Sequence, residues 1–390
     1  MSVTAPRGFV ASGIACGIKT SGQSDLALVV TDDHAAVPAA GVFTSNLAAA
    51  APVQVSRAHL AATGGLAAGV VLSSGNANAA TGAPGVADAT TMCRMVAEGI
   101  GTTTESVLVC QTGLIGIPLP MTPVVSGIPL LVEALDGGRD AAVAAATAIM
   151  TTDTARKEAV VVGDGFTVGA MAKGAAMLAP DMATMLAVLT TDARAEPATL
   201  ADALGRAVAS SFNRLSVDGC TSTNDTVLVL AGGRSGATPA IDALTDALGE
   251  ACSRLAAAMA DDAEGATKVS HVVVSGAASA EEAHRAARRV ADSLLVKCSL
   301  NGADPYWGRV VSELGTAGVS FDLDRVEVAY GDVVVCRNGV AVAHDADALA
   351  AHMAGRHVVI RCDLGLGPGR AAVLGTDLGY GYIDENRTTS

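Results

Sequence analysis

The fold is organised around residues 171–191, which read Met-Ala-Lys-Gly-Ala-Ala-Met-Leu-Ala-Pro-Asp-Met-Ala-Thr-Met-Leu-Ala-Val-Leu-Thr-Thr. Gly174 and Pro180 interrupt this apolar run, and because proline lacks a backbone N–H donor they argue against one continuous helix. From Met185 onward the residues predict a buried strand. Thr184 therefore lies where an irregular, accessible segment enters a rigid core strand, and such a position suits a nucleophile.

Thr184 acquires a second reactive group if the bond before it is cut, because its hydroxyl and its own α-amine then belong to one residue. A free α-amine has a pKa of about 7.7–8.0, so it can act as a base near neutral pH. Threonine activated by an N-terminal amine is a known type of nucleophile. The residues alone leave open the alternative that Thr184 only begins a strand.

The composition limits the class of protein. The 390 residues suffice for one large or two ordinary domains. Half of them are hydrophobic and only 3% are aromatic, which predicts a core of small aliphatic side chains. The formal charge of −14 disfavours nucleic acid and anionic membrane surfaces as partners.

Several signals are missing from the sequence. No cysteine pair has Cys-x-x-Cys spacing, the histidines form no metal-like cluster, and no metal is expected. Scattered single cysteines in apolar runs predict reduced core residues of a cytosolic protein. No stretch has the features of a signal peptide, and no apolar run approaches the roughly 18 residues that a membrane span needs. We therefore expect a cytoplasmic protein.

Strand and helix patterns alternate irregularly along the chain, so the predicted class is α+β or layered α/β. Short β-rich runs occupy 9–31 and 41–73. Helices are predicted by apolar residues at i, i+4 spacing, the clearest after Pro197 and from Ile241 to Met259. The remaining strands are expected at 70–72, 107–110, 158–172 (as a hairpin), 271–276, 325–336, 339–343, 357–362 and 371–375, and the remaining helices at 86–100, 139–150, 279–294 and 345–354.

Four polar positions follow predicted strands or helices. Thr112-Gly113 comes after the strand 107–110, where a backbone N–H beside a hydroxyl could donate to an oxyanion, although a simple turn fits as well. Thr151 begins a polar cluster of the kind that caps a helix. Lys173 ends the predicted hairpin. Glu264 follows a helix, where acidic residues oppose the helix dipole, and that local cost suggests another use for its charge.

These positions fall in blocks that resemble ornithine acetyltransferases, the bifunctional acetyltransferases of arginine biosynthesis. The self-cleaving segment of that family resembles Lys173-Gly174 followed by the residues from Met177 to Leu186. Further blocks follow in family order over nearly the whole chain, and they are Ser74-Gly75-Asn76-Ala77-Asn78-Ala79, Thr112-Gly113-Leu114-Ile115-Gly116, Met150-Thr151-Thr152-Asp153-Thr154 with Lys157, Asp218-Gly219 with Ser222-Thr223-Asn224-Asp225-Thr226, Glu264-Gly265-Ala266-Thr267-Lys268, Asp304-Pro305-Tyr306-Trp307-Gly308-Arg309, and a tail with Asn386.

The resemblance implies a layered α-β-β-α sandwich of the N-terminal-nucleophile type. It implies a precursor that cuts itself between Ala183 and Thr184. An α chain, 1–183, and a β chain, 184–390, would then form one intertwined catalytic unit. Two of each chain are expected to assemble into a heterotetramer.

The resemblance also implies a reaction and a site. An acetyl group would pass from N2-acetylornithine to glutamate through an acetyl ester on Thr184, without a cofactor, and acetyl-CoA stays open as a second donor. Thr112 and Gly113 would form the oxyanion hole. The implied substrate contacts are Thr151, Lys173, Thr184, Glu264, Asn386 and Ser390.

Three alternatives stay open. A self-cleaving aminopeptidase or amidase of a related fold would release its product to water. A paralogue acting on another acylated amino acid would fit positions that depart from the family pattern, such as Cys220 and Tyr306. A binding or scaffold protein would have the same packing without chemistry at Thr184.

Overall fold

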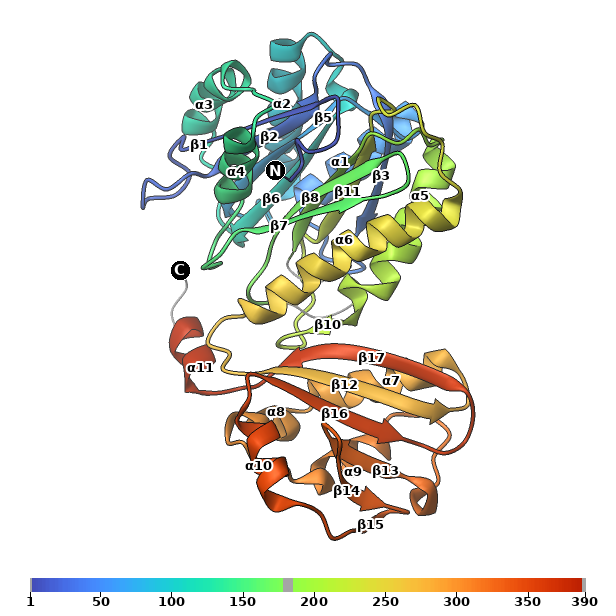
Figure 1. Cartoon of the computed structure of the whole chain (residues 1–390). Helices are drawn as coiled ribbons and strands as arrows, with labels where there is room; N and C mark the ends of the chain where they lie inside the picture. Colours follow the sequence, from blue (N-terminus) through green and yellow to red (C-terminus); the bar gives the residue numbers. More distant parts are fainter. Residues whose placement is uncertain (1, 178–184, 388–390) are drawn as a thin grey trace.

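The computed structural model describes residues 2–177 and 185–387, and these residues form three mixed sheets and their covering helices in two lobes (Figure 1). Two of the sheets belong to the first lobe, and the third forms the second lobe near the C-terminus. Strands and helices are mixed in both lobes. The predicted α+β class is therefore confirmed.

The first sheet has the strand order β1-β2-β5-β6. The pairs β1–β2 and β2–β5 are antiparallel, whereas β5 and β6 run parallel. The strands span β1 Phe9–Ile14, β2 Leu26–Thr31, β5 Gly69–Asn76 and β6 Val107–Leu114.

The second sheet has the order β4-β3-β11-β9-β8-β7, with β9 and β11 as its parallel pair. The described parts of the segment quoted first, 171–177 and 185–191, meet in this sheet, since β8 ends at Lys173 and β9 begins at Leu186, and these two residues are partners across the antiparallel pair. The strands span β3 Val37–Phe43, β4 Leu66–Ala67, β7 Lys157–Val162, β8 Thr167–Lys173, β9 Leu186–Thr191 and β11 Thr226–Ala231.

These two sheets lie between two layers of helices. Small aliphatic side chains such as Val70 and Val188 fill the space between the sheets. Helices α2 (Gly82–Ile100) and α3 (Met121–Glu133) cover the outer face of the first sheet, and α5 (Pro197–Ser210) and α6 (Ile241–Asp261) cover the second. The layering is therefore the α-β-β-α sandwich that the resemblance implied. The other helices of this lobe are α1 Ala51–Thr63 and α4 Arg139–Ala148.

The second lobe contains a sheet of order β10-β17-β12-β16-β13-β14-β15. Its apolar core, which includes Val272 and Ala287, lies between the sheet and its helices (Figure 1). The elements are β10 Leu215–Ser216, β12 Val269–Ala277, β13 Glu327–Tyr330, β14 Val333–Arg337, β15 Val340–Ala341, β16 His357–Asp363 and β17 Gly369–Thr376, with α7 Ala280–Asp292, α8 Leu294–Asn301, α9 Trp307–Leu314, α10 Ala346–Ala354 and α11 Tyr380–Asn386.

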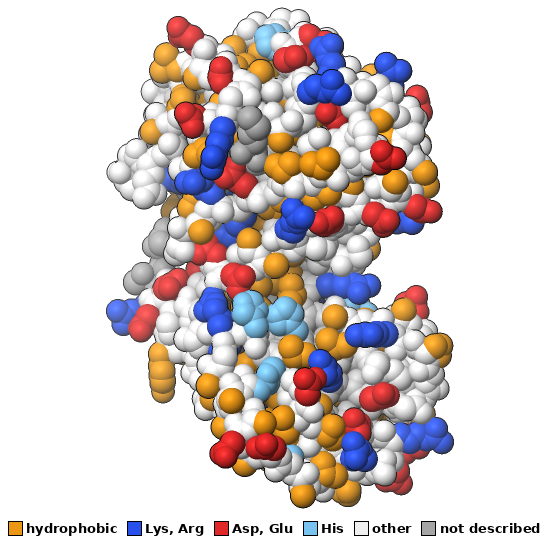
Figure 2. Space-filling model, in the orientation of Figure 1, with side chains coloured by type: hydrophobic (Ala, Val, Ile, Leu, Met, Phe, Trp, Pro, Cys, Tyr) orange, Lys and Arg blue, Asp and Glu red, His pale blue; other side chains and the backbone are white. Residues whose placement is uncertain are grey.

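Polar side chains meet where the lobes join. His357 Nε2 lies 3.2 Å from Asp261 at the end of α6, and His271 Nε2 lies 3.1 Å from His357 Nδ1. Histidine side chains gather at this junction in the space-filling view, where the outline of the molecule narrows (Figure 2). Among the helices that the structure describes, none combines the length and the apolar character that crossing a bilayer requires.

Two sequence expectations about secondary structure were wrong. Residues 41–73 were expected to be β-rich, but they contain the helix α1, which has Pro at its start and ends at Gly64 with a φ of 67°. The alternation of Val53 and Val55 imitated a strand, although both are buried on the helix. The single strand expected over 325–336 is a hairpin, because Gly331, with a φ of 59°, turns the chain between β13 and β14.

The packing of helices on the sandwich leads to a prediction about the free energy of unfolding. Leu248 on α6 is fully buried against the second sheet, so Leu248→Ala is expected to lower the free energy of unfolding by about 2–5 kcal/mol. Leu130→Ala on α3 is the matched control, since Leu130 is 58% exposed and its loss is expected to cost about 0.5 kcal/mol or less. Urea denaturation measures both, and equal losses would contradict the layering.

Candidate active site

One cavity of about 440 Å³ collects residues from segments that are far apart in the sequence. Six of the residues predicted for the site line it, and they are Thr112, Gly113, Thr151, Lys173, Glu264 and Asn386. They come from the end of β6, the loop after α4, the end of β8, the loop after α6, and α11. The functional roles given to these residues stay predictions, but the structure brings the six together.

Three predicted site residues lie outside the described residues: the nucleophile Thr184, its neighbour Ala183 at the predicted cleavage bond, and Ser390. The described residues on either side of the first two are held by carboxylates. Met177 lines the cavity, and its N–H donates to Asp218 Oδ2 over 2.5 Å. The N–H of Met185 donates to Asp225 Oδ1 over 2.9 Å.

Thr112 and Gly113 lie inside β6 and not in a turn, because β6 continues to Leu114. Gly113 has a φ of 132°, and a Cβ there would lie 2.3 Å from the carbonyl carbon of Gly75 on β5. Only glycine permits this approach of the two strands. Asn224 links β6 to the residues that follow β5, since its Nδ2 donates to Gln111 O (2.8 Å) and Ala77 O (2.6 Å).

Lys173 connects the two sheets at the cavity. Its Nζ donates to Thr112 Oγ1 over 3.3 Å, which leaves the hydroxyl proton of Thr112 available to another acceptor. The side chain is buried, and burial lowers the pKa of its ammonium, while Asp153, Glu264 and Asp225 oppose that shift. A buried cation surrounded by carboxylates is one mark of a functional site.

Asp225, the acid beside Met185, is also buried. Burial raises the pKa of its carboxyl well above the ordinary value, against the opposing effects of the Met185 amide, Ser222 and Lys173. Asp225 precedes β11, which pairs with β9, and Lys173 ends β8, which pairs with β9 from the other side. One acid and one base thus flank the start of the central strand.

The helix α11 closes one side of the cavity through two polar contacts. Asn386 Nδ2 donates to Glu264 Oε2 over 2.7 Å, and the hydroxyl of Tyr382 donates to Asp218 Oδ2 over 3.2 Å. The carboxylates of Asp218, Glu264 and the exposed Glu385 make this side acidic. The arrangement offers carboxylates to a ligand ammonium group on one side and the Lys173–Thr112 pair on the other.

Sequence reasoning missed several residues of the cavity wall, which include Asp218, Tyr382 and Glu385. Asp218 belongs to one of the blocks that resemble the family, but no role was assigned to it. The glycine that follows it was the only signal in the sequence. Tyr382 and Glu385 belong to a helix of seven residues, too short to show a reliable apolar period. Cys220, which stands outside the apolar runs of the sequence, also lines the cavity and is exposed.

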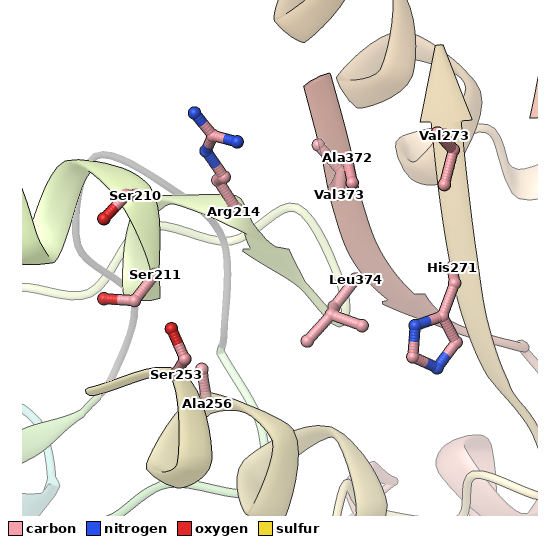
Figure 3. A pocket seen from close by; sticks show the side chains of 10 residues that line it. All are labelled: Ser210, Ser211, Arg214, Ser253, Ala256, His271, Val273, Ala372, Val373 and Leu374. Atoms are coloured by element: carbon pink, nitrogen blue, oxygen red, sulfur yellow. The ribbon is translucent and has the colours of Figure 1, made fainter. Parts of the chain in front are cut away.

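A second cavity, of about 220 Å³, lies between α5, α6 and the sheet of the second lobe (Figure 3). Serine residues at the end of α5 and on α6 lie on one side of it and Leu374 of β17 on the other, and Arg214 and His271 also line it. It contains none of the predicted site residues. Within the described ranges, no group of three or more His, Cys, Asp or Glu side chains is placed to hold a metal ion.

The family model and the related sequences indicate one family. The model described as the ArgJ family matches residues 10–388. The chain is 48% identical over 398 residues to the arginine biosynthesis bifunctional protein ArgJ of Mycolicibacterium paratuberculosis, covering 100% of this chain and 96% of that protein. It is 45% identical over 392 residues to the protein of the same name from Thermobifida fusca, covering 100% of both. Among solved structures, the ornithine acetyltransferase complexed with ornithine from Mycobacterium tuberculosis is 39% identical, with a TM-score of 0.42 over 47% of this chain and 96% of that chain.

The docking of α11 generates a prediction that is independent of any activity. Gly265 has a φ of 61°, and a Cβ there would lie 2.1 Å from the amide nitrogen of Tyr382. Gly265→Ala is therefore expected to displace α11 and to speed amide hydrogen exchange in that helix.

Gly101→Ala is the matched control, because Gly101 has a φ of 75° but nothing within 4 Å of an added Cβ. Both substitutions carry the same backbone strain, of about 1–2 kcal/mol. Hydrogen exchange that changes equally in α11 for both variants would show that the contact with Gly265 does not hold the helix.

Proposed function

The chain belongs to the ArgJ family, and from this premise we propose that Thr184 carries an acetyl group from N2-acetylornithine to glutamate. The chain is an acetyltransferase of arginine biosynthesis, as its relatives are. The observation that most supports the proposed site is the convergence of six residues, spread from position 112 to position 386, on one cavity. Acetyl-CoA would be the donor for a second activity of the same site.

The described neighbours of Thr184 support its role as the nucleophile. Leu186, two residues further on, is paired with Lys173, whose ammonium contacts Thr112. Met177, before the undescribed segment, lines the cavity itself. The chain on both sides of residues 178–184 is therefore held at the same cavity.

The first half-reaction removes the acetyl group from N2-acetylornithine. The α-amine of Thr184 takes the hydroxyl proton while the oxygen attacks the acetyl carbonyl carbon. The hydroxyl of Thr112 and the amide of Gly113 donate to the oxyanion, and one such donor is typically worth about 2.7–4 kcal/mol. The C–N bond then breaks, the proton passes from the amine to the leaving nitrogen, and ornithine departs from an acetyl-Thr184 ester.

In the second half-reaction, the amine of glutamate attacks the carbonyl carbon of that ester. The bond between this carbon and the Thr184 oxygen breaks, a proton passes from the attacking amine to that oxygen, and N-acetylglutamate departs. One site thus serves two substrates in turn, which implies ping-pong kinetics. The side chain of ornithine ends in an ammonium group, and Glu264 and Asp218 offer carboxylates to it. Lys173 offers a positive charge to the substrate carboxylate.

The same hydroxyl would cut the precursor. Its oxygen attacks the carbonyl carbon of Ala183, and the bond between residues 183 and 184 breaks as the hydroxyl proton passes to the Thr184 nitrogen, which becomes the free α-amine. Water then hydrolyses the resulting ester. The two chains would remain associated, because β8 of the α chain and β9 of the β chain are adjacent strands of one sheet. We propose an assembly of two α and two β chains.

Thr184→Ala is expected to yield one uncut and inactive chain of 390 residues, since both the cleaving oxygen and the acetyl acceptor are lost. The intact mass of the purified protein measures cleavage. Wild-type protein, the control, is expected to give two chains of 183 and 207 residues, the numbers that residues 1–183 and 184–390 contain. A Thr184→Ala protein that is cleaved or active would refute the assignment.

The acceptor of the acetyl group separates the proposal from the amidase alternative. With N2-acetylornithine and glutamate together, acetylglutamate is expected to form in step with ornithine. Chromatography of both products against free acetate measures the partition. An aminopeptidase or amidase would instead release acetate at a rate that glutamate does not change, and a binding protein would release neither product.

A further inference from the structure

Lys157 is a buried lysine that the proposed mechanism does not use. Its side chain is 1% exposed. The residue begins β7 and lies outside the cavity wall. Its Nζ lies 2.7 Å from Asp153 Oδ1 and 2.5 Å from Asp262 Oδ2, and it also donates to Ala155 O over 3.3 Å. One cation therefore joins two carboxylates that belong to different segments of the chain.

Asp153 connects Lys157 to two segments of the cavity wall. Its Oδ2 accepts the N–H of Thr151 over 3.0 Å, and its Oδ1 accepts the N–H of Gly174 over 2.7 Å. Gly174 directly follows Lys173. The Asp153 carboxylate thus fixes the backbone at Thr151 and the end of β8, from which Lys173 extends to Thr112.

Asp262 connects Lys157 to a third segment of the cavity wall, the loop that carries Glu264. Its carboxylate accepts the N–H of Thr154 over 3.0 Å and also the hydroxyl of Thr154. Asp262 lies two residues before Glu264, whose own N–H donates to Ala175 O over 2.9 Å. The loop that carries Glu264 is therefore held against both the Thr151 loop and the residues that follow Lys173.

We propose that Lys157 is a positioning residue that, through Asp153 and Asp262, sets the relative placement of Thr151, Lys173 and Glu264 around the substrate. The inference rests on the proposed function, because it takes these three residues as substrate contacts. A displacement of about 1 Å at a reacting centre can lower the rate by about 10²-fold, so a link of this kind affects catalysis without touching the substrate.

The same cluster sets the charge on Lys173. Burial on its own would raise the pKa of Asp153, but Lys173 and Lys157 hold it at about 2, so it is ionised at neutral pH. The Asp153 carboxylate raises the pKa of Lys173, whereas Lys157 lowers it. The other charged groups acting in this region are Glu264 from the loop after α6, Asp225 before β11, and Lys19 from the loop between β1 and β2.

Two substitutions give opposite expectations for the pH profile of kcat/KM. The alkaline limb is expected where Lys173 loses its proton, and with it the positive charge that it offers to the substrate carboxylate. Lys157→Met removes a charge that lowers the pKa of Lys173, so this limb is expected to move to higher pH. Asp153→Asn removes a charge that raises that pKa, so the limb is expected to move to lower pH. Both variants break the link, and kcat/KM at neutral pH is expected to fall by about 10-fold to 100-fold.

Two further variants separate positioning from stability. Lys157→Arg keeps the cation and is expected to restore the position of the alkaline limb. Lys268→Met is the matched control, since Lys268 is 8% exposed and its Nζ donates to Gly355 O, away from the cavity. It is expected to lose stability but to keep the wild-type KM and pH profile. All rates are measured well below the melting temperature of each variant.

Ornithine binding, measured by calorimetry over the same pH range, keeps this inference separate from the proposed function. A wild-type protein that binds ornithine but transfers no acetyl group would refute the transfer, while the shifts in the pH dependence of binding would still report on Lys157. The inference is overturned if Lys157→Met and Asp153→Asn lower the melting temperature but leave KM, ornithine affinity and the pH profile unchanged. Shifts of both variants in the same direction would also overturn it.

Discussion

The burial of the Lys173 ammonium is the constraint on which the site depends. A buried charge is costly unless it is paired and hydrogen-bonded. The fold meets this requirement by bringing Asp153, Asp225 and Glu264 towards the end of β8, each from a different element. Because Lys173 extends from the second sheet to Thr112 on the first, the charge also joins the two layers of the sandwich at the cavity.

The strands on either side of the predicted cleavage bond are placed by the same geometry. The bond lies in the sequence between β8 and β9, which are antiparallel neighbours in the interior of the second sheet. Strands in this position are held by hydrogen bonds on both sides, so a cut between them would free a chain end without separating the sheet. The parallel partner β11 supplies Asp225 beside Met185, and the start of β9 is therefore fixed from the side opposite to Lys173.

Much of this arrangement could be predicted from the sequence. Strong apolar periods marked α5 and α6, a continuous apolar run marked β9, and ordered blocks of residues marked Thr112, Lys173 and Glu264. The prediction failed where local pattern and tertiary context disagree. The valines of α1 alternate as in a strand although a proline and a glycine bound a helix there. Thr112 and Gly113 resembled a turn, yet the backbone of Gly75 on the neighbouring strand extends β6 through them.

The second lobe and α11 show a different limit of prediction from the sequence. Most strands of that lobe were predicted, but the lobe itself depends on pairings between distant segments, such as β12 with β16 and β17, which no local pattern reveals. Asp218 and Tyr382 are 164 positions apart, and only the folded chain brings them together. Lys157 was visible in a recognised block, whereas its link to Asp262 was not.

The central claim is that the acetyl group rests on Thr184 between the two half-reactions. Mass spectrometry of the purified protein after incubation with N2-acetylornithine, in the absence of glutamate, tests this claim most directly. The account predicts one added acetyl group on the peptide that begins with Thr184, and its loss when glutamate is added. An unmodified Thr184 peptide, or an acetyl group on another residue that glutamate removes, would contradict it.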